Sequence, residues 1–261
     1  MFENRRGFLL AAIAVITLPL AAQTTSAAPR ALRIAAAADL QPVLPDVLAR
    51  FTADGNIHVD VTYQSSATLA TQIMNGAPFD LFLAADLSFP QRVIAATLAE
   101  EAQPITYARG TLVLWTRNDS RFKNLSMDSL RDPDLKSLAV ANAEHAPYGR
   151  AAQAALKHLG LYQQVESKLV IAENIAQTAQ YVESGNAELG LISLTSALTP
   201  RLKVSGHCVV VPQDAYPPIL QGAVIVKRAG ANSADAHRFL DFLMSAPIQS
   251  QLADRGLAPA K

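Results

Sequence analysis

The chain has 261 residues, 22 basic and 22 acidic side chains, and hydrophobic residues make up 50% of it. This balanced charge argues against a nucleic-acid or membrane-surface role, because both need a basic patch or stripe. The length and the apolar content allow a large core, in one large domain or in two lobes.

Residues 1–28 have the features of an export signal. Arg5 and Arg6 precede an apolar stretch over 7–22, and Thr25-Ser-Ala27 offers a cleavage site of small residues. The stretch is short for a membrane-spanning helix, which needs roughly 20 residues, and Pro19 interrupts it. The arginine pair also resembles a twin-arginine signal, so both that export route and the general one stay open. We expect an exported protein of the periplasm.

Beyond the signal, strand-like apolar runs alternate with amphipathic helical patterns. The predicted strands are Leu32–Ala37, His58–Tyr63, Asp80–Ala84, Leu112–Thr116, Leu138–Ala141, Lys168–Ala172, Leu189–Leu194, Cys208–Val211 and Gly222–Val226. The predicted helices are Val43–Ala53, Thr68–Asn75, Phe89–Ala96, Arg150–Leu159, Ile175–Ser184 and Ala234–Met244. This alternation is the signature of an α/β protein with mainly parallel sheets flanked by helices. If two lobes form, the long apolar runs Gly110–Thr116 and Ile219–Val226 are the predicted crossovers between them.

At four places a strand-like run passes through small or hydroxyl residues into a helical pattern. These places are 34–39, 61–68, 140–149 and 170–175. A helix N-terminus has unsatisfied backbone N–H groups and the positive end of the helix dipole. Several such termini converging on one point would hold an anion without a cationic side chain, which predicts an oxyanion receptor.

Three of these junctions contain specific candidate donors. Ser65-Ser-Ala-Thr68 opens a helix, where its hydroxyls either only cap the helix or, since capping needs one of the three, leave a surplus hydroxyl for a ligand. Tyr148-Gly149 follows a proline and enters another helix, where the tyrosine either packs at a turn or donates to the same point as Ser66. Asn174 is a good cap for a third helix, whose donor would be the main-chain N–H of Ile175.

The chain resembles the periplasmic molybdate-binding proteins of ABC importers, within the periplasmic binding protein superfamily. The resemblance runs from about Leu32 to the C-terminus. It rests on five motifs taken together, namely Gln64-Ser-Ser-Ala-Thr-Leu-Ala70, Gly76-Ala-Pro-Phe-Asp-Leu-Phe-Leu-Ala-Ala-Asp86, Leu112-Val-Leu-Trp115, Asn142-Ala-Glu-His-Ala-Pro-Tyr-Gly149 and Ala172-Glu-Asn-Ile175.

This resemblance implies a two-lobed, type II binding-protein fold with a ligand cleft between the lobes. We expect one lobe from residues 29–108 plus 220–261 and the other from 109–219. The resemblance also implies oxyanion donors at Ala38 and Ser66 in the first lobe, and at Tyr148, Ile175 and Ser193 in the second. Two positions depart from the family pattern, which has a serine or threonine where Ala38 stands and often a tyrosine where Ser193 stands.

Asp39 and Ser65 are neighbours of these donors with uncertain roles. A carboxylate facing a bound dianion at a few ångströms would cost on the order of several kcal/mol at intermediate dielectric. We therefore expect Asp39 to be an N-cap whose carboxylate is turned away from the cleft, unless the ligand is not a simple dianion.

Other kinds of site find little support in the sequence. The five histidines show no metal-ligand spacing, so no residue is expected to ligate a cation directly. No nucleophile elbow, P-loop or dinucleotide fingerprint is present, which argues against an enzyme. Cys208 has apolar neighbours and is predicted to be a buried strand thiol.

The sequence therefore predicts a monomeric binding protein that captures molybdate or tungstate and delivers it to the membrane permease of an ABC importer. No cofactor and no nucleic-acid partner are expected. Three alternatives stay open. The first is the same fold with another oxyanion or a small organic anion, the second is an exported ligand sensor that does not feed transport, and the third is an exported hydrolase.

Overall fold

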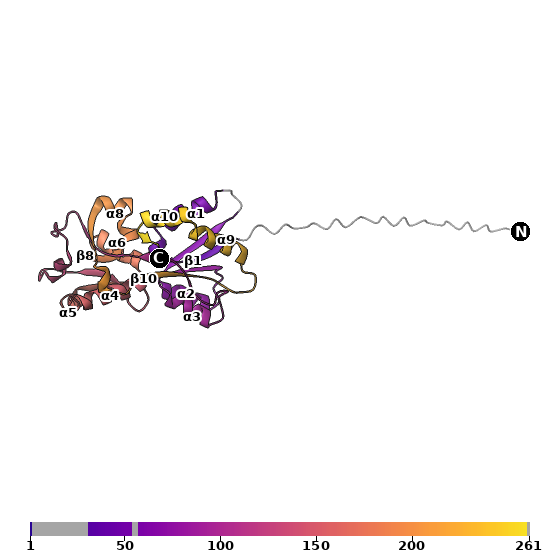
Figure 1. The fold of residues 1–261 in the computed structure, drawn as a ribbon, viewed down its shortest axis with the longest axis horizontal. Helices are drawn as coiled ribbons and strands as arrows, with labels where there is room; N and C mark the ends of the chain where they lie inside the picture. Colours follow the sequence, from indigo (N-terminus) through magenta and orange to yellow (C-terminus); the bar gives the residue numbers. More distant parts are fainter. Residues whose placement is uncertain (2–30, 54–56, 260–261) are drawn as a thin grey trace.

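The computed structural model describes Met1 and residues 31–53 and 57–259. The predicted export signal therefore lies outside the described residues, apart from Met1. Figure 1 shows two lobes side by side along the long axis of the molecule, each built on its own β-sheet. No helix of the described part is long and apolar enough to cross a membrane.

The first lobe is built on a six-stranded sheet. Its strands, in spatial order, are β11 (Leu257–Ala258), β4 (Ile105–Gly110), β10 (Ile219–Ile225), β3 (Leu81–Ala84), β1 (Leu32–Ala37) and β2 (Val59–Gln64). The central strands β1 and β3 are almost wholly buried, as continuous apolar runs require when helices cover both faces.

Helices cover the two faces of this sheet. One face carries α1 (Leu44–Phe51), α9 (Ser233–Met244) and α10 (Ala246–Asp254), and the opposite face carries α2 (Ser66–Met74) and α3 (Ser88–Ala95) (Figure 1). The short 3₁₀ helix η1 (Ala38–Leu40) directly continues β1. The turn after α2 needs the glycine found there, since Gly76 has a φ of 86°.

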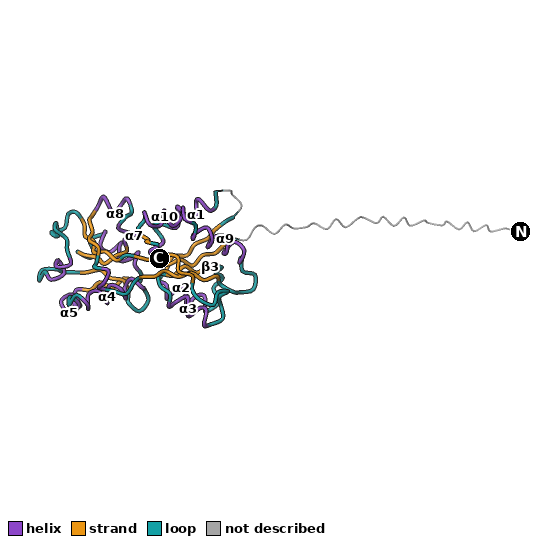
Figure 2. Tube along the Cα trace, in the orientation of Figure 1, coloured by secondary structure: helices purple, strands orange, loops and turns teal. Residues whose placement is uncertain are grey.

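The second lobe is built on a five-stranded sheet. Its strands, in spatial order, are β7 (Leu169–Ala172), β6 (Leu138–Ala141), β8 (Leu189–Ser193), β5 (Leu112–Arg117) and β9 (Gly206–Val210). Its helices are α4 (Pro147–His158), α5 (Tyr162–Val165), α6 (Ile175–Glu183), α7 (Leu194–Ala197) and α8 (Pro200–Ser205). Three 3₁₀ helices complete it, η2 (Met127–Arg131), η3 (Glu166–Lys168) and η4 (Gln213–Ala215). Figure 2 shows helices on the outside of the strands in each lobe.

Extended strands connect the two lobes. β4 ends at Gly110 in the first sheet, and β5 begins at Leu112 in the second. The chain returns from β9 through η4 to β10. The predicted crossover runs therefore contain β5 and β10, while the strand β4 that leads into the first crossover was missed.

The predicted fold of two lobes, each a sheet flanked by helices, is confirmed, although the sheets are mixed and not mainly parallel. β1 pairs in parallel with β2 and β3, and β6 with β7 and β8. The pairings of β10 with β3 and β4, of β11 with β4, and of β5 with β8 and β9 are antiparallel. The antiparallel pairings arise from the crossovers between the lobes. Parallel neighbours need a long connection, usually a covering helix, and a strand that passes directly from one sheet to the other has no such connection.

The prediction of a buried thiol at Cys208 was also wrong. The residue lies in β9, as predicted, but β9 is an edge strand and Cys208 is exposed. Partial burial of the thiol still raises its pKa, which keeps it protonated and weakly nucleophilic.

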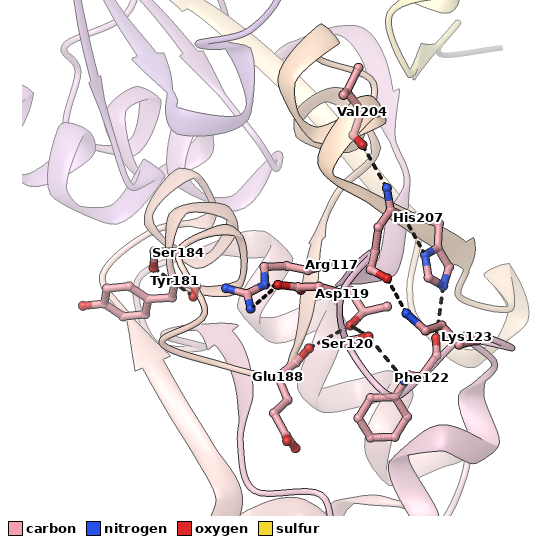
Figure 3. A network of polar contacts seen from close by, with 12 residues as sticks. Arg117, Asp119, Ser120, Phe122, Lys123, Tyr181, Ser184, Glu188, Val204 and His207 are labelled. Carbon is pink, nitrogen blue, oxygen red and sulfur yellow. Dashed lines mark hydrogen bonds and ion pairs between the residues drawn. The ribbon is translucent and has the colours of Figure 1, made fainter.

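A polar network holds the end of the second lobe far from the first lobe (Figure 3). Asn118, just after β5, donates from its side chain to the carbonyl of Val204 over 2.9 Å. His207 on β9 approaches the carbonyl of Phe122 with its Nε2 at 3.1 Å. These contacts tie the long loop after β5 to β9 and α8, so this end of the lobe is held by its own side chains.

Candidate functional site

A small cavity lies between the lobes where the first turns of several helices meet. The space that a water-sized sphere can occupy there is about 10 Å³. Its wall consists of residues at the ends of strands and the starts of helices, namely Ala37, Ala38, Asp39, Gln64, Ser65, Ser66, Ala85, Ala146, Pro147, Tyr148, Asn174 and Ile175. All four junctions that the sequence indicated thus contribute to one wall.

The two serines at the start of α2 have different roles. Ser65 is the N-cap, and its hydroxyl accepts a hydrogen bond from the N–H of Thr68 over 3.2 Å. Ser66 is 1% exposed, and its hydroxyl accepts from the N–H of Ala85 over 3.0 Å. Because a hydroxyl has one proton and two lone pairs, this bond leaves the Ser66 proton free to donate into the cavity.

Tyr148 lies in the first turn of α4, directly after Pro147 at the start of the helix. A residue in this position has no intrahelical acceptor for its main-chain N–H. The start of α4 approaches β6 closely, since a Cβ at Gly149 would lie 2.3 Å from the carbonyl oxygen of Ala141. The glycine therefore allows the N-terminus of α4 to reach the wall of the cavity.

Ile175 occupies the corresponding place on α6. Asn174 is the N-cap, and its side-chain oxygen accepts from the N–H of Gln177 over 3.0 Å. This cap leaves the N–H of Ile175, in the first turn, without an intrahelical acceptor. The side chain of Ile175 is buried and contributes an apolar part of the wall.

Ala38 and Asp39 contribute the first-lobe wall next to β1. Both lie in η1, whose N-cap is Ala37 and has no side-chain capping bond. The expectation that Asp39 is an N-cap with its carboxylate turned away was therefore wrong. Its Oδ2 accepts a hydrogen bond from the hydroxyl of Tyr148 over 3.1 Å and another from the side-chain amide of Gln221.

The environment of Asp39 disfavours its charged form. The residue is fully buried, and this burial raises the pKa of its carboxyl from 3.8 to about 6, although the hydrogen bonds from Gln221 and Tyr148 lower it. Burial and the nearby Asp39 charge together raise the pKa of the Tyr148 hydroxyl well above its ordinary value. The tyrosine therefore stays protonated and donates.

Ser193 is not among the residues of the cavity wall. It is fully buried as the N-cap of α7, where its hydroxyl accepts from the N–H of Ser196 and lies 2.8 Å from the hydroxyl of Thr195. The Thr195 hydroxyl also lies 2.8 Å from the carbonyl oxygen of Asp39, and because it has one proton it donates to only one of these two oxygens at a time. Ser193 thus reaches the cavity wall only through Thr195 and Asp39.

Sequence reasoning missed Thr195 and Gln221. Gln221 is a fully buried amide in β10, flanked in the sequence by apolar and small residues. A polar side chain inside an apolar strand is a recognisable signal, because burying an amide is unfavourable unless it has a partner. Its partner, Asp39, is too distant along the chain for the sequence to reveal.

Two further contacts between the lobes involve residues that do not line the cavity. The N–H of Ala67 on α2 donates to the carbonyl of His145 across the cleft over 3.2 Å. Arg150 on α4 forms an ion pair with Asp86, which follows β3. Together with the contacts of Asp39 to Tyr148 and Thr195, these two contacts join the lobes.

The chemistry of the wall suits an anion more than a cation. Among the described residues, no lysine, arginine or histidine lines the cavity, and its donors are N–H groups and hydroxyls. Within the described residues, no group of three or more His, Cys, Asp or Glu side chains could hold a metal ion. The wall can therefore hold an anion only through hydrogen bonds and helix dipoles.

Comparison with known proteins gives the same picture. Residues 32–258 match the family model of the bacterial extracellular solute-binding proteins. The chain is 35% identical to the molybdate-binding protein ModA of Rhodobacter capsulatus over 90% of this chain and 88% of the relative. It is 35% identical to ModA of Azotobacter vinelandii over 81% of this chain and 83% of that protein.

Solved structures agree on the fold. The periplasmic molybdate-binding protein of Azotobacter vinelandii superposes with a TM-score of 0.82 and 26% identity, covering 88% of this chain and all of that one. A sulfate-binding protein of Mycobacterium tuberculosis has a TM-score of 0.73 at 15% identity and shares the fold alone. These similar proteins are all named as binding proteins. The chain belongs to the bacterial extracellular solute-binding proteins and, among them, to the ModA molybdate-binding protein family.

Proposed function

We propose that this protein captures molybdate, or tungstate, in the cavity between its lobes and delivers it to the membrane permease of an ABC importer. The observation that carries the proposal is the set of neutral donors from both lobes around one buried cavity. The similarity to molybdate-binding proteins over most of the chain supports the choice of ligand.

The proposed donors are the main-chain N–H groups of Ala38, Tyr148 and Ile175 and the hydroxyl of Ser66. Each hydrogen bond to a charged acceptor contributes about 1.5–3 kcal/mol. Ser193 has a supporting role in this proposal, because its hydroxyl contacts the hydroxyl of Thr195, which contacts the main chain of Asp39.

Ligand binding is proposed to pull the lobes together. A ligand that contacts both lobes binds the closed state more tightly and shifts the population towards it. The cavity has room for about one water-sized sphere, so a four-oxygen anion needs the lobes slightly further apart than they are here. The permease would recognise the closed, loaded form, and the protein would act as a monomer in the periplasm after loss of residues 1–28.

The proposed lobes are residues 29–108 with 220–261, and residues 109–219. Each side of the cavity then belongs to one lobe, with Ala38 and Ser66 facing Tyr148 and Ile175. A hinge at the two crossovers would separate these donors and open the site to solvent.

Calorimetry of the ligand-stripped protein with molybdate, tungstate and sulfate tests the proposal. We expect molybdate and tungstate to bind with similar affinity and sulfate to bind far more weakly. If none of the three binds, the proposed function is wrong.

A second candidate is the same fold with another oxyanion or a small organic anion. The buried carboxyl of Asp39 in the cavity wall favours it, because a fixed negative charge would repel a dianion. A thermal-shift screen of oxyanions and small carboxylates separates the two candidates. The first requires molybdate or tungstate to stabilise the protein most, and the second requires another anion to do so.

A further inference from the structure

Of the described residues that line the cavity, Asp39 is the one whose side chain can be negatively charged at neutral pH. Its two carboxyl oxygens differ sharply in their surroundings. Oδ2 accepts from both Tyr148 and Gln221, whereas Oδ1 is buried and has no hydrogen-bond partner among the described residues. A buried charged oxygen without a donor is costly, so this oxygen calls for an explanation.

The buried polar groups around Asp39 include more hydrogen-bond acceptors than available donors. The side-chain oxygen of Gln221 is a second buried acceptor without a donor in the described structure. The nearby hydroxyl protons are already used, because Tyr148 donates to Asp39 and Tyr107 donates to the carbonyl of Ala84 over 3.3 Å. One proton on Oδ1 of Asp39 would turn an unsatisfied acceptor into a donor.

The groups around Asp39 provide no positive charge to stabilise its ionised form. Gln221 from β10, Thr195 from α7, and the tyrosines Tyr148 from α4 and Tyr107 from β4 are all uncharged. The elements packed against η1 include α6, α7 and β2, whose remaining ionisable residues are Asp60, Tyr63, Tyr181 and Glu183. On α4 and β4, the cations Arg109, Lys157 and His158 are exposed and Arg150 pairs with Asp86, so none of them is paired with Asp39.

We propose that the cavity takes up its oxyanion together with one proton, which Asp39 holds at Oδ1 and donates to an oxygen of the bound anion. This inference rests on the proposed function and adds a binding residue to it. Solvent supplies the proton when binding occurs with Asp39 ionised. The neutral carboxyl removes the repulsion of a dianion and adds a donor to the wall.

Asp39 is close to this state without a ligand. Burial raises the pKa of its carboxyl to about 6, and a dianion beside it would raise the pKa further. Above that pKa only the protonated fraction binds, and this fraction falls tenfold with each pH unit. The apparent affinity should therefore fall by roughly tenfold per pH unit between about pH 7 and about pH 9.

The test is calorimetry of the wild-type protein with molybdate across this pH range, in buffers of different ionisation enthalpy. We expect the affinity to fall as described, with uptake of about one proton per anion at the alkaline end. Asp39→Asn keeps the size and the donor but cannot ionise. Its affinity should vary little with pH and should exceed that of the wild type at about pH 8 by roughly tenfold or more.

Asp86→Asn is the matched control. It removes a carboxylate from the same cleft but outside the wall of the cavity, so it should keep the pH dependence of the wild type. An affinity that does not change with pH, without proton uptake, overturns the inference even if Asp39→Asn fails to fold. An equal pH dependence in Asp39→Asn also overturns it. Binding of molybdate in either case leaves the proposed function intact, while no binding at any pH overturns both.

Discussion

The hydroxyl of Tyr148 donates a hydrogen bond to the carboxyl of Asp39, and these two residues come from opposite lobes. The bond therefore exists only when the lobes are closed. It joins a side chain at the start of α4 to one at the end of β1, within the wall of the cavity. Closure and the state of the Asp39 carboxyl are thus linked by one contact.

Ser66→Ala should weaken molybdate binding by roughly tenfold or more. The variant removes the Ser66 hydroxyl, which accepts a hydrogen bond from the N–H of Ala85 and has its proton free for a ligand. A lost hydrogen bond to a charged ligand accounts for an effect of this size. Calorimetry measures the affinity. Ser65→Ala is the matched control, because Ser65 caps α2 and its loss should cost about 1 kcal/mol of stability with a smaller change in affinity. Equal affinities for Ser66→Ala and the wild type would rule out the assignment of Ser66.

Gly110→Ala should destabilise the closed protein through Tyr148. A Cβ at Gly110 would lie 2.2 Å from the Tyr148 hydroxyl oxygen, which is closer than non-bonded atoms can approach. We expect a loss of roughly 1–3 kcal/mol in the free energy of unfolding, measured by denaturant titration.

Adding Tyr148→Phe to Gly110→Ala should recover part of this loss, because it removes the clashing oxygen. A double-mutant cycle measures the coupling between the two positions. Strictly additive effects of the two substitutions would show that the clash with the hydroxyl is not the cause.

Asp39→Asn should stabilise the ligand-free protein at neutral pH and leave its stability nearly unchanged below about pH 4. The carboxyl has a pKa of about 6 in the folded protein against an ordinary value of 3.8. Between these values the folded state holds more protons than the unfolded state, so wild-type stability falls as pH rises through this window.

The expected gain for Asp39→Asn above about pH 7 is up to about 3 kcal/mol, from roughly two pKa units. Denaturant titrations of both proteins at several pH values provide the comparison. A constant difference in stability between the two proteins at every pH would show that ionisation of the Asp39 carboxyl is not the cause of the gain.

Asp80→Ala should destabilise the first lobe by roughly 1–3 kcal/mol, because it removes the ion pair with the partly buried Arg228 and leaves the N–H of Arg33 without its acceptor. The fully buried carboxylate of Asp80 pairs with Arg228 at 2.6 Å and accepts from the N–H of Arg33 over 2.9 Å. Thermal unfolding followed by circular dichroism measures the loss. Asp60→Ala, an exposed position on β2, should change stability little.

Much of the fold follows from local pattern. The strands Leu32–Ala37 and Leu138–Ala141 have the predicted bounds, because continuous apolar runs bounded by polar or turn residues are specific at short range. The strand Ile105–Gly110 and the helix Ala246–Asp254 were missed. In the strand Tyr107 and Arg109 interrupt the apolar pattern, and in the helix polar residues surround Ile248 and Leu252, so neither run is distinctive alone.

In the candidate site, too, some features follow from the local sequence and others do not. The capping roles of Ser65 and Asn174 follow from the sequence, since a cap and the N–H that it satisfies lie within three residues. The partners of Asp39 do not, since Tyr148, Thr195 and Gln221 are each more than a hundred residues away.

By itself, the sequence determined which segments become strands and helices, which residues cap the helices, and which helix starts have donors to offer. These properties depend on neighbours along the chain. Only the tertiary structure decided that these starts meet at one cavity, that Ser193 lies outside its wall, and that Asp39 turns inward. The reason is that the burial and the hydrogen bonds of a side chain depend on elements that the crossovers bring together from distant parts of the chain.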